Sequence, residues 1–174
     1  SNGTISGGTA QTHTYTPNGN YNGSDSFTFK VKDGSLFSNV ATVSITINPV
    51  NDAPSATAQT VTAVEDTAKT ITLSGTDPEG SSLTYTVVTG PSNGTIANGN
   101  TSTPIYTPSG NFNGTDTFTF KVNDGSLDSG AATVTVNVSA VNDAPSANAQ
   151  SVTTAEDTAK TITLSGTDPE GSSL

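Results

Sequence analysis

Apolar and polar residues alternate along most of the chain with a period of two. This alternation places successive side chains on opposite faces of an extended strand. At 117–122, two phenylalanines and a valine alternate with two threonines and a lysine, and at 133–138 three valines alternate in the same way. No stretch has apolar residues at helical spacing. For residues 51–141 the pattern predicts seven short strands, near 58–64, 69–74, 82–89, 94–97, 102–107, 116–123 and 131–139.

Turn sequences separate these predicted strands. Examples are DPEG at 77–80, PSGN at 108–111 and NDG at 123–125, rich in residues that tolerate the positive φ of tight turns. Short alternating strands with frequent turns predict an all-β fold, a Greek-key β-sandwich of immunoglobulin-like type. The sequence lacks the cysteine pair and the tryptophan of antibody domains, which indicates a different family of sandwich.

The chain repeats itself in register every 91 residues. Residues 1–83 align with 92–174 without a gap, and 58 of these 83 positions are identical. The longest identical run, EDTAKTITLSGTDPEGSSL, begins at residue 65 and again at residue 156. A fixed period of this length indicates tandem modules. We therefore divide the chain into the later part of one repeat (1–50), a complete repeat (51–141) and the earlier part of a further repeat (142–174).

The composition narrows the possible partners. Fifteen Asp and Glu residues face five Lys, which gives a formal net charge of −10. Nucleic acid and anionic membranes need a basic patch, so we expect neither as a partner, and no apolar run is long enough for membrane insertion. Divalent cations are compatible with this charge. Because cysteine is absent, neither disulfides nor thiolate metal sites can rigidify the chain.

Acidic and amide residues recur at corresponding positions of the repeats, at strand ends or between repeats. Between repeats these residues are Asn51 with Asp52 and Asn142 with Asp143, and after the first strand they are Glu65 and Glu156. In the turns they are Asp77 with Glu79 and Asp168 with Glu170 (TDPEG), Asp25 and Asp116 (after NG), and Asp33 and Asp124 (the late DG turns).

The order of these motifs resembles that of cadherins. NDAP, a Glu about a dozen residues later, TDPEG before LTYTV, and FTFKVNDG before the last strand occur in the cadherin order. The whole chain is similar to the cadherin-like tandem repeats of large bacterial surface and secreted adhesins. This resemblance implies cadherin-type sandwiches stacked end to end, with Ca²⁺ held at each joint. The joint motif is shorter than in cadherins and the LDRE motif is missing, which favours one or two ions per joint.

We predict that the acidic residues converge at two joints. At the first joint these are Asp52, Asp77, Glu79 and Asp124, with Asn51 beside them and Asp25 as a further candidate. At the second joint they are Glu65, Asp143, Asp168 and Glu170, with Asn142 beside them and Asp116 as a further candidate. Taken singly, each could be an ordinary solvated turn residue. It is the ordered set that favours Ca²⁺ as a bound cofactor.

These features favour a non-catalytic structural extender of an extracellular adhesin or cell-surface fibre. Its expected partners are neighbouring repeats of the chain or neighbouring copies in a fibre, with cell-surface or glycan ligands bound through other domains. His13 is the only histidine and its counterpart is Pro104, so no histidine-based catalytic set can be assembled. The alternative is a carbohydrate- or protein-binding module of a secreted protein, although the high identity between repeats argues against it.

Both ends of the sequence fall inside a repeat, which leaves two interpretations. The first, which we prefer, is a window on a longer, continuous repetitive fibre. The second is a subunit of a filament assembled by donor strands, in which one chain's end completes the next.

Overall fold

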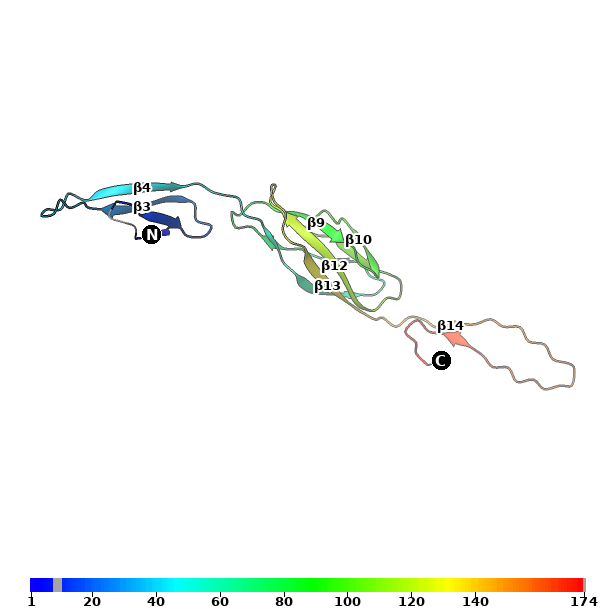
Figure 1. Cartoon of the computed structure of the whole chain (residues 1–174). Helices are drawn as coiled ribbons and strands as arrows, with labels where there is room; N and C mark the ends of the chain where they lie inside the picture. Colours follow the sequence, from blue (N-terminus) through cyan, green and yellow to red (C-terminus); the bar gives the residue numbers. More distant parts are fainter. Residues whose placement is uncertain (8–10, 174) are drawn as a thin grey trace.

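The computed structural model of the chain describes residues 1–7 and 11–173, and every regular element among them is a strand. This part of the chain contains no helix long and apolar enough to cross a membrane. Three parts follow one another along an elongated molecule (Figure 1). Strands β1–β4 form one end, β5–β13 the middle, and β14 with β15 the other end.

The middle part is a two-layered sandwich, which we call the middle sandwich. One sheet has the order β6-β13-β12-β9, with β6 parallel to β13 and the other neighbours antiparallel. The second sheet has the order β10-β11-β7, and β5 pairs with β8 in a separate short ladder. The bounds are β5 (Ser55–Ala56), β6 (Gln59–Val64), β7 (Lys69–Thr70), β8 (Gly75–Thr76), β9 (Thr84–Thr89), β10 (Gly94–Ala97), β11 (Ile105–Pro108), β12 (Gly114–Asn123) and β13 (Ala132–Ser139).

The core lies between the two sheets and follows directly from the alternation. In β13 the buried and more exposed residues alternate, and the buried valines lie beside the buried side chains of β12, as in the Phe118–Val134 pair. Tyr106 from β11 closes the core from the second sheet, with Ile71 and Leu73 from the segment after β7. Full burial of side chains of this size contributes on the order of 1.5–3 kcal/mol each.

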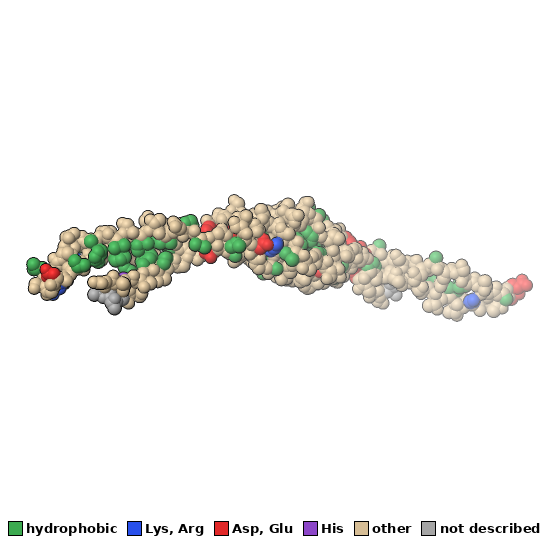
Figure 2. All heavy atoms as spheres, turned by 45° about the horizontal axis from the view of Figure 1, so that its top comes forward, with side chains coloured by type: hydrophobic (Ala, Val, Ile, Leu, Met, Phe, Trp, Pro, Cys, Tyr) green, Lys and Arg blue, Asp and Glu red, His purple; other side chains and the backbone are tan. Residues whose placement is uncertain are grey.

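The N-terminal part consists of two hairpins. They are formed by β1 (Gly3–Ser6) with β2 (Thr14–Pro17), and by β3 (Gly23–Phe29) with β4 (Ala41–Ile47). Their register repeats that of β10–β11 and β12–β13, but no other described segment pairs with them to cover their apolar face. Phe29 is therefore 45% exposed, whereas its counterpart Phe120 is fully buried. Figure 2 shows the result as a continuous apolar strip along this part of the molecule.

In residues 142–173 the strands are β14 (Ser146–Ala147) and β15 (Gly166–Thr167), which pair as β5 and β8 do. The apolar side chains of this C-terminal part are also uncovered. Leu164 is 82% exposed, whereas Leu73, its counterpart in the middle sandwich, is 3% exposed.

The structure confirms the all-β sandwich class and corrects the expected strands in two places. Residues 71–73 lie outside β7: Ile71 donates its N–H to the carbonyl of Pro104, and a proline has no N–H to return. The two-residue strands β5 and β8 were not predicted, because two residues are too few to show alternation.

Candidate metal centre

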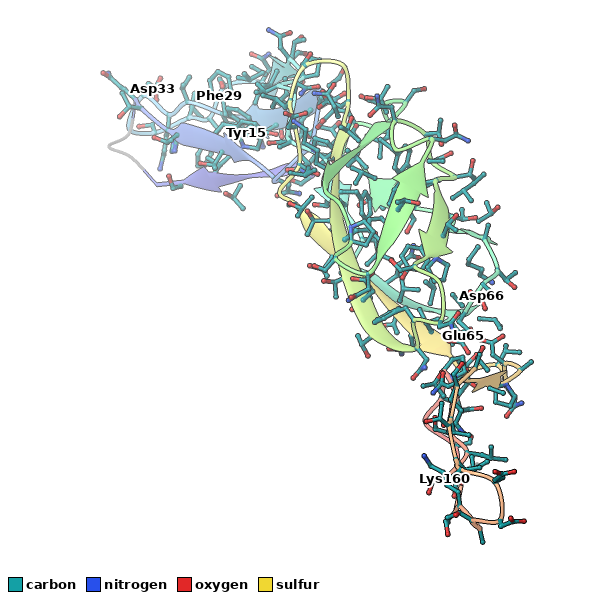
Figure 3. The ribbon with its side chains drawn as sticks, turned by 90° about the vertical axis from the view of Figure 1, so that its right-hand side faces the viewer. Tyr15, Phe29, Asp33, Glu65, Asp66 and Lys160 are labelled. Carbon is teal, nitrogen blue, oxygen red and sulfur yellow. The ribbon has the colours of Figure 1, made fainter. Side chains whose placement is uncertain are left out.

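Three carboxylates meet where the middle sandwich ends and the C-terminal part begins. Glu65 directly follows β6, Asp143 follows β13, and Glu170 lies in the turn after β15. One carboxylate oxygen of each lies within 4.8 Å of those of the other two. Figure 3 shows Glu65 at the end of the middle sandwich that faces the C-terminal part. The structure thus brings together three of the four acids predicted for the second joint.

Backbone hydrogen bonds hold this three-acid group in place. Glu65 is 1% exposed, and its Oε1 accepts a hydrogen bond from the backbone N–H of Val141 in the linker. The N–H of Glu65 donates to the carbonyl of Ser139 at the end of β13 (3.0 Å). Across the joint, the N–H of Asp143 donates to Glu170 Oε2 (3.0 Å). The linker is therefore tied to both of the parts that it connects.

Two further oxygens of the group are buried without a partner among the described residues. Glu65 Oε2 and Asp143 Oδ2 accept no hydrogen bond from the described residues. Partial burial, followed by the charges of Glu170, Asp66 and Glu65, raises the pKa of the Asp143 carboxyl above its usual range. Buried carboxylates that repel one another are costly unless a cation or a donor compensates them.

The donor set fits a hard divalent cation. Ca²⁺ takes six to eight oxygen ligands from carboxylates, carbonyls and water in flexible geometry, whereas zinc sites are built mainly from Cys and His. The three-acid group offers only carboxylate oxygens, and two of them are free of hydrogen bonds. Glu65, Asp143 and Glu170 would hold the ion, and backbone carbonyls or water would complete its shell.

Asp168 and Asn142, both predicted for the second joint, lie outside the three-acid group. Asp168 Oδ1 accepts hydrogen bonds from the backbone N–H groups of Glu170 (3.1 Å) and Ser172 (2.9 Å), so this carboxylate orders the turn that presents Glu170. The side-chain amide of Asn142 donates to the carbonyl of Asp143 (3.3 Å).

The first joint brings its predicted residues together in pairs. The N–H of Asp52 donates to Glu79 Oε2 (3.0 Å), the same bond that links Asp143 to Glu170. The side-chain amide of Asn51 donates to Asp124 Oδ2 (2.8 Å). Hydrogen bonds from the N–H of Leu127, the amide of Asn51 and the N–H of Ser126 lower the pKa of Asp124. Two predicted pairs thus lie at the start of the middle sandwich.

Asp77 orders the turn at this joint as Asp168 does at the second. Its Oδ1 accepts from the N–H groups of Glu79 (3.1 Å) and Ser81 (2.8 Å), while its Oδ2 is buried without a partner. A hollow of about 180 Å³ lies beside Asp52 and Glu79 and is also lined by residues 20–22. Among the described residues no third acid joins this pair.

The structure does not bring Asp116 into the three-acid group, and the prediction for this residue is corrected. Its carboxylate is buried and accepts four hydrogen bonds, from the N–H groups of Ser92, Asn93 and Thr117 and from the hydroxyl of Tyr106 (2.9–3.1 Å). A carboxylate with four donors needs no cation. Asp116, which lies in β12, therefore links the loop before β10 and the Tyr106 side chain of β11 to its own strand by hydrogen bonds.

Asp25 occupies the corresponding place in the N-terminal part and is corrected in the same way. It accepts hydrogen bonds from the N–H groups of Asn2 and Ser26 and from the hydroxyl of Tyr15 (2.8 Å each). The hydrogen bond from Tyr15 is the main cause of its lowered pKa. Desolvation and the hydrogen bond to Asp25 raise the pKa of the Tyr15 hydroxyl to about 12. Burial and the hydrogen bond to Asp116 likewise raise the pKa of the Tyr106 hydroxyl well above its usual value.

The NG sequence at 93–94, where β10 begins, belongs to the same arrangement. A Cβ atom at Gly94 would lie 2.6 Å from the carbonyl oxygen of Thr107 and 2.7 Å from the ring of Tyr106. Only glycine allows this approach, which brings the N–H of Asn93 to Asp116. The repeated NGT sequence is therefore explained by packing.

We expect Asp116→Asn to destabilise the middle sandwich by about 2–4 kcal/mol, because an amide cannot accept from all four donors and the charge that strengthens these bonds is lost. Urea unfolding followed by tyrosine fluorescence measures this. The loss should be the same with calcium and with chelator. A loss confined to calcium-containing buffer would make Asp116 a ligand after all.

Asp66 is a residue of the second joint that the sequence reasoning missed. Its backbone has a positive φ of 56°, its Oδ1 accepts from the N–H of Asn111 (3.2 Å), and its charge contributes to the raised pKa of Asp143. Figure 3 places it next to Glu65. The available signal was the repeated EDT sequence, in which Asp66 is as invariant between the two copies as Glu65.

The fold and the joint define a class, the immunoglobulin-like and cadherin-like sandwich modules. Among solved structures the chain is similar to protocadherin gammaB7 EC3-6 (TM-score 0.56, 14% identity, 97% of this chain and 50% of that one). It is also similar to the protocadherin GammaB4 extracellular domain (TM-score 0.55, 17% identity, 97% of this chain and 32% of that one). At these identities the likeness concerns the fold alone.

Sequence comparison assigns the family. The model of the bacterial Ig domain matches residues 1–46 and 51–137, and the chain belongs to this family. A curated relative, the integrin beta-like protein E of Dictyostelium discoideum, is 28% identical over 190 residues. That match covers 91% of this chain and only 10% of the relative's length.

Proposed function

We propose that this chain is a non-catalytic extender of an extracellular or cell-surface protein, whose consecutive repeats are held in line by Ca²⁺ at the joints. The observation that carries the proposal is the three-acid group, because two of its buried oxygens have no partner and its members come from both sides of the joint. The bacterial Ig family and the cadherin-like fold agree with an adhesin-type structural module.

The physical role of the ion follows from its position. Without a cation, the like charges of Glu65, Asp143 and Glu170 repel one another and push the two parts apart. A divalent ion would turn this repulsion into attraction and fix the angle between the parts. Extracellular modules bind Ca²⁺ with Kd values of about 10⁻⁴–10⁻³ M, so the joint would be filled by the calcium of the surrounding medium. Its partners in this role are the neighbouring repeats.

Small-angle X-ray scattering with calcium and with chelator tests the proposal. In dilute solution we expect chelation to broaden the distribution of molecular shapes, because the second joint bends more freely. The double substitution Asp143→Asn with Glu170→Gln should give the chelated profile even in calcium. Identical scattering under both conditions would contradict a calcium-stiffened joint.

A further inference from the structure

The loop between the last two strands of the repeat has the same backbone in both copies. Between β3 and β4, the N–H groups of Asp33 and Ser38 donate to backbone carbonyls across the loop (3.2 and 2.9 Å). Between β12 and β13, the N–H groups of Asp124 and Ser129 make the corresponding bonds (3.2 and 2.8 Å). The conformation of this loop is therefore a property of the repeat, and the middle sandwich shows the loop in a complete unit.

The complete unit leaves this loop open to solvent. In the middle sandwich, which follows another part of the chain, Leu127 is 42% exposed and the side chain of Asp128 is 47% exposed. The corresponding residues between β3 and β4, Leu36 and Phe37, are 73% and 68% exposed. Since a complete unit exposes both positions, we expect Leu36 and Phe37 to reach solvent in a complete repeat as well.

In the middle sandwich the side chains of this loop satisfy one another. Asp128 lies opposite Asn123 across the loop and accepts a hydrogen bond from its amide (2.9 Å). The other oxygen of Asp128 forms a salt bridge with Lys121 (2.6 Å). This copy of the loop thus presents a neutralised pair of charges and no apolar side chain at position 128.

In the N-terminal part, Lys32 and Phe37 take the places of this amide and this acid. The Lys32 Nζ lies over the Phe37 ring, 5.3 Å from its centroid, a cation–π contact. Lys30 is the counterpart of Lys121 and has no acid at position 37 to pair with. Among the residues that the structure describes, the one salt bridge is that of Lys121 with Asp128. Two lysines without a carboxylate partner therefore flank an exposed aromatic ring.

The charge of the loop changes sign between the two copies. Residues 28–40 hold two lysines and one aspartate, a net charge of +1, whereas residues 119–131 hold one lysine and two aspartates, a net charge of −1. The one acid of the first loop, Asp33, is occupied by the N–H groups of Ser35 and Leu36 (3.0 and 2.9 Å). On a chain with a net charge of −10, this loop is a local site at which an anionic group is attracted.

We propose that residues 30–40, which we call the aromatic loop, bind an anionic polysaccharide, a role beyond that of an extender. Phe37 would stack on the apolar face of a sugar ring, and Lys30 and Lys32 would contact its carboxylate or sulfate groups. In an extended chain, lysines two residues apart lie on one face, roughly 7 Å from each other, so one short stretch of polymer can reach both. A sugar fits better than the pocket of an acidic protein, because Lys32 already covers one face of the ring and leaves one flat face free.

Biolayer interferometry on immobilised polymers tests the proposal. Chelator is present throughout, so that metal ions cannot bridge the polymers to the acidic joints and the outcome is independent of the proposed function. The parent chain should bind dextran sulfate and hyaluronate but not neutral dextran, and binding should weaken as the salt concentration rises. The double substitution Lys32→Asn with Phe37→Asp installs the pair found in the middle sandwich and should weaken binding about 10-fold or more. Lys160→Asn removes a lysine at the opposite end of the molecule from Asp33 (Figure 3) and should bind like the parent.

The reverse exchange tests the same side chains in a complete unit. Asn123→Lys with Asp128→Phe, added to the first double variant, should restore binding, because the two loops share one backbone and the middle sandwich has its own core. Unchanged thermal unfolding of the middle sandwich would show that this variant is folded.

Several outcomes overturn the proposal. These are a parent chain that binds no polysaccharide or binds neutral dextran as well as dextran sulfate, a first double variant that binds like the parent, and a folded reverse exchange that does not bind. Binding to polyglutamate without binding to either anionic polysaccharide would assign the aromatic loop to an acidic protein instead. Binding to only one of the two anionic polymers retains the proposal and identifies the anionic group.

Discussion

Phe120→Ala should destabilise the middle sandwich by about 3–5 kcal/mol, whereas Phe29→Ala, in the same FTFKV sequence, should change its stability by less than about 0.5 kcal/mol. Phe120 is fully buried in the core, and its removal leaves a cavity between the sheets. Phe29 is 45% exposed and lies outside the middle sandwich. The expected loss is a large part of the total stability of a domain of this size.

Urea unfolding in dilute solution, followed by tyrosine fluorescence, measures both variants. The pair is matched because the substitution and its immediate sequence are the same, and only the burial differs. Equal losses in the two variants would mean that the N-terminal part has a packed core of its own in solution.

Calcium should raise the stability of the second joint and of the sandwich attached to it, and Glu65→Gln should abolish this gain. With a Kd of about 10⁻⁴ M, a calcium concentration of about 10 mM stabilises the bound state by about 2.7 kcal/mol. For a domain of this size this corresponds to a rise in Tm of about 10–20 °C. Differential scanning calorimetry with and without chelator measures the change.

The substitution separates the charge of Glu65 from its structural contact. The glutamine carbonyl can still accept the hydrogen bond from Val141, so the variant in chelator should be at least as stable as the parent, because one repelling charge is removed. Glu156→Gln is the matched control, since Glu156 occurs in the same EDT sequence and is exposed. The same calcium gain in the parent and in Glu65→Gln would exclude this residue as a ligand.

The sequence by itself determined the longer strands and the fold class. The alternation of Val and Phe with Thr required one apolar and one polar face per strand, and seven such short strands with turns between them are typical of a β-sandwich. The 91-residue period showed which acidic residues recur near the boundaries between repeats. The alternation and the turns are local properties, and the repeat is visible in the sequence itself, so none of them needs the tertiary structure.

Only the tertiary structure decided which acids meet. Asp116 and Glu65 are both buried acids near strand ends, yet Asp116 is satisfied by four donors from three segments, while Glu65 keeps an oxygen without a partner. The sequence could not distinguish them, because the N–H groups of Ser92 and Asn93 and the hydroxyl of Tyr106 are brought to Asp116 only by the fold. Likewise, Phe29 and Phe120 share one local sequence and differ in burial. The reason is that burial depends on whether the other half of the unit, far along the chain, is present to cover the side chain.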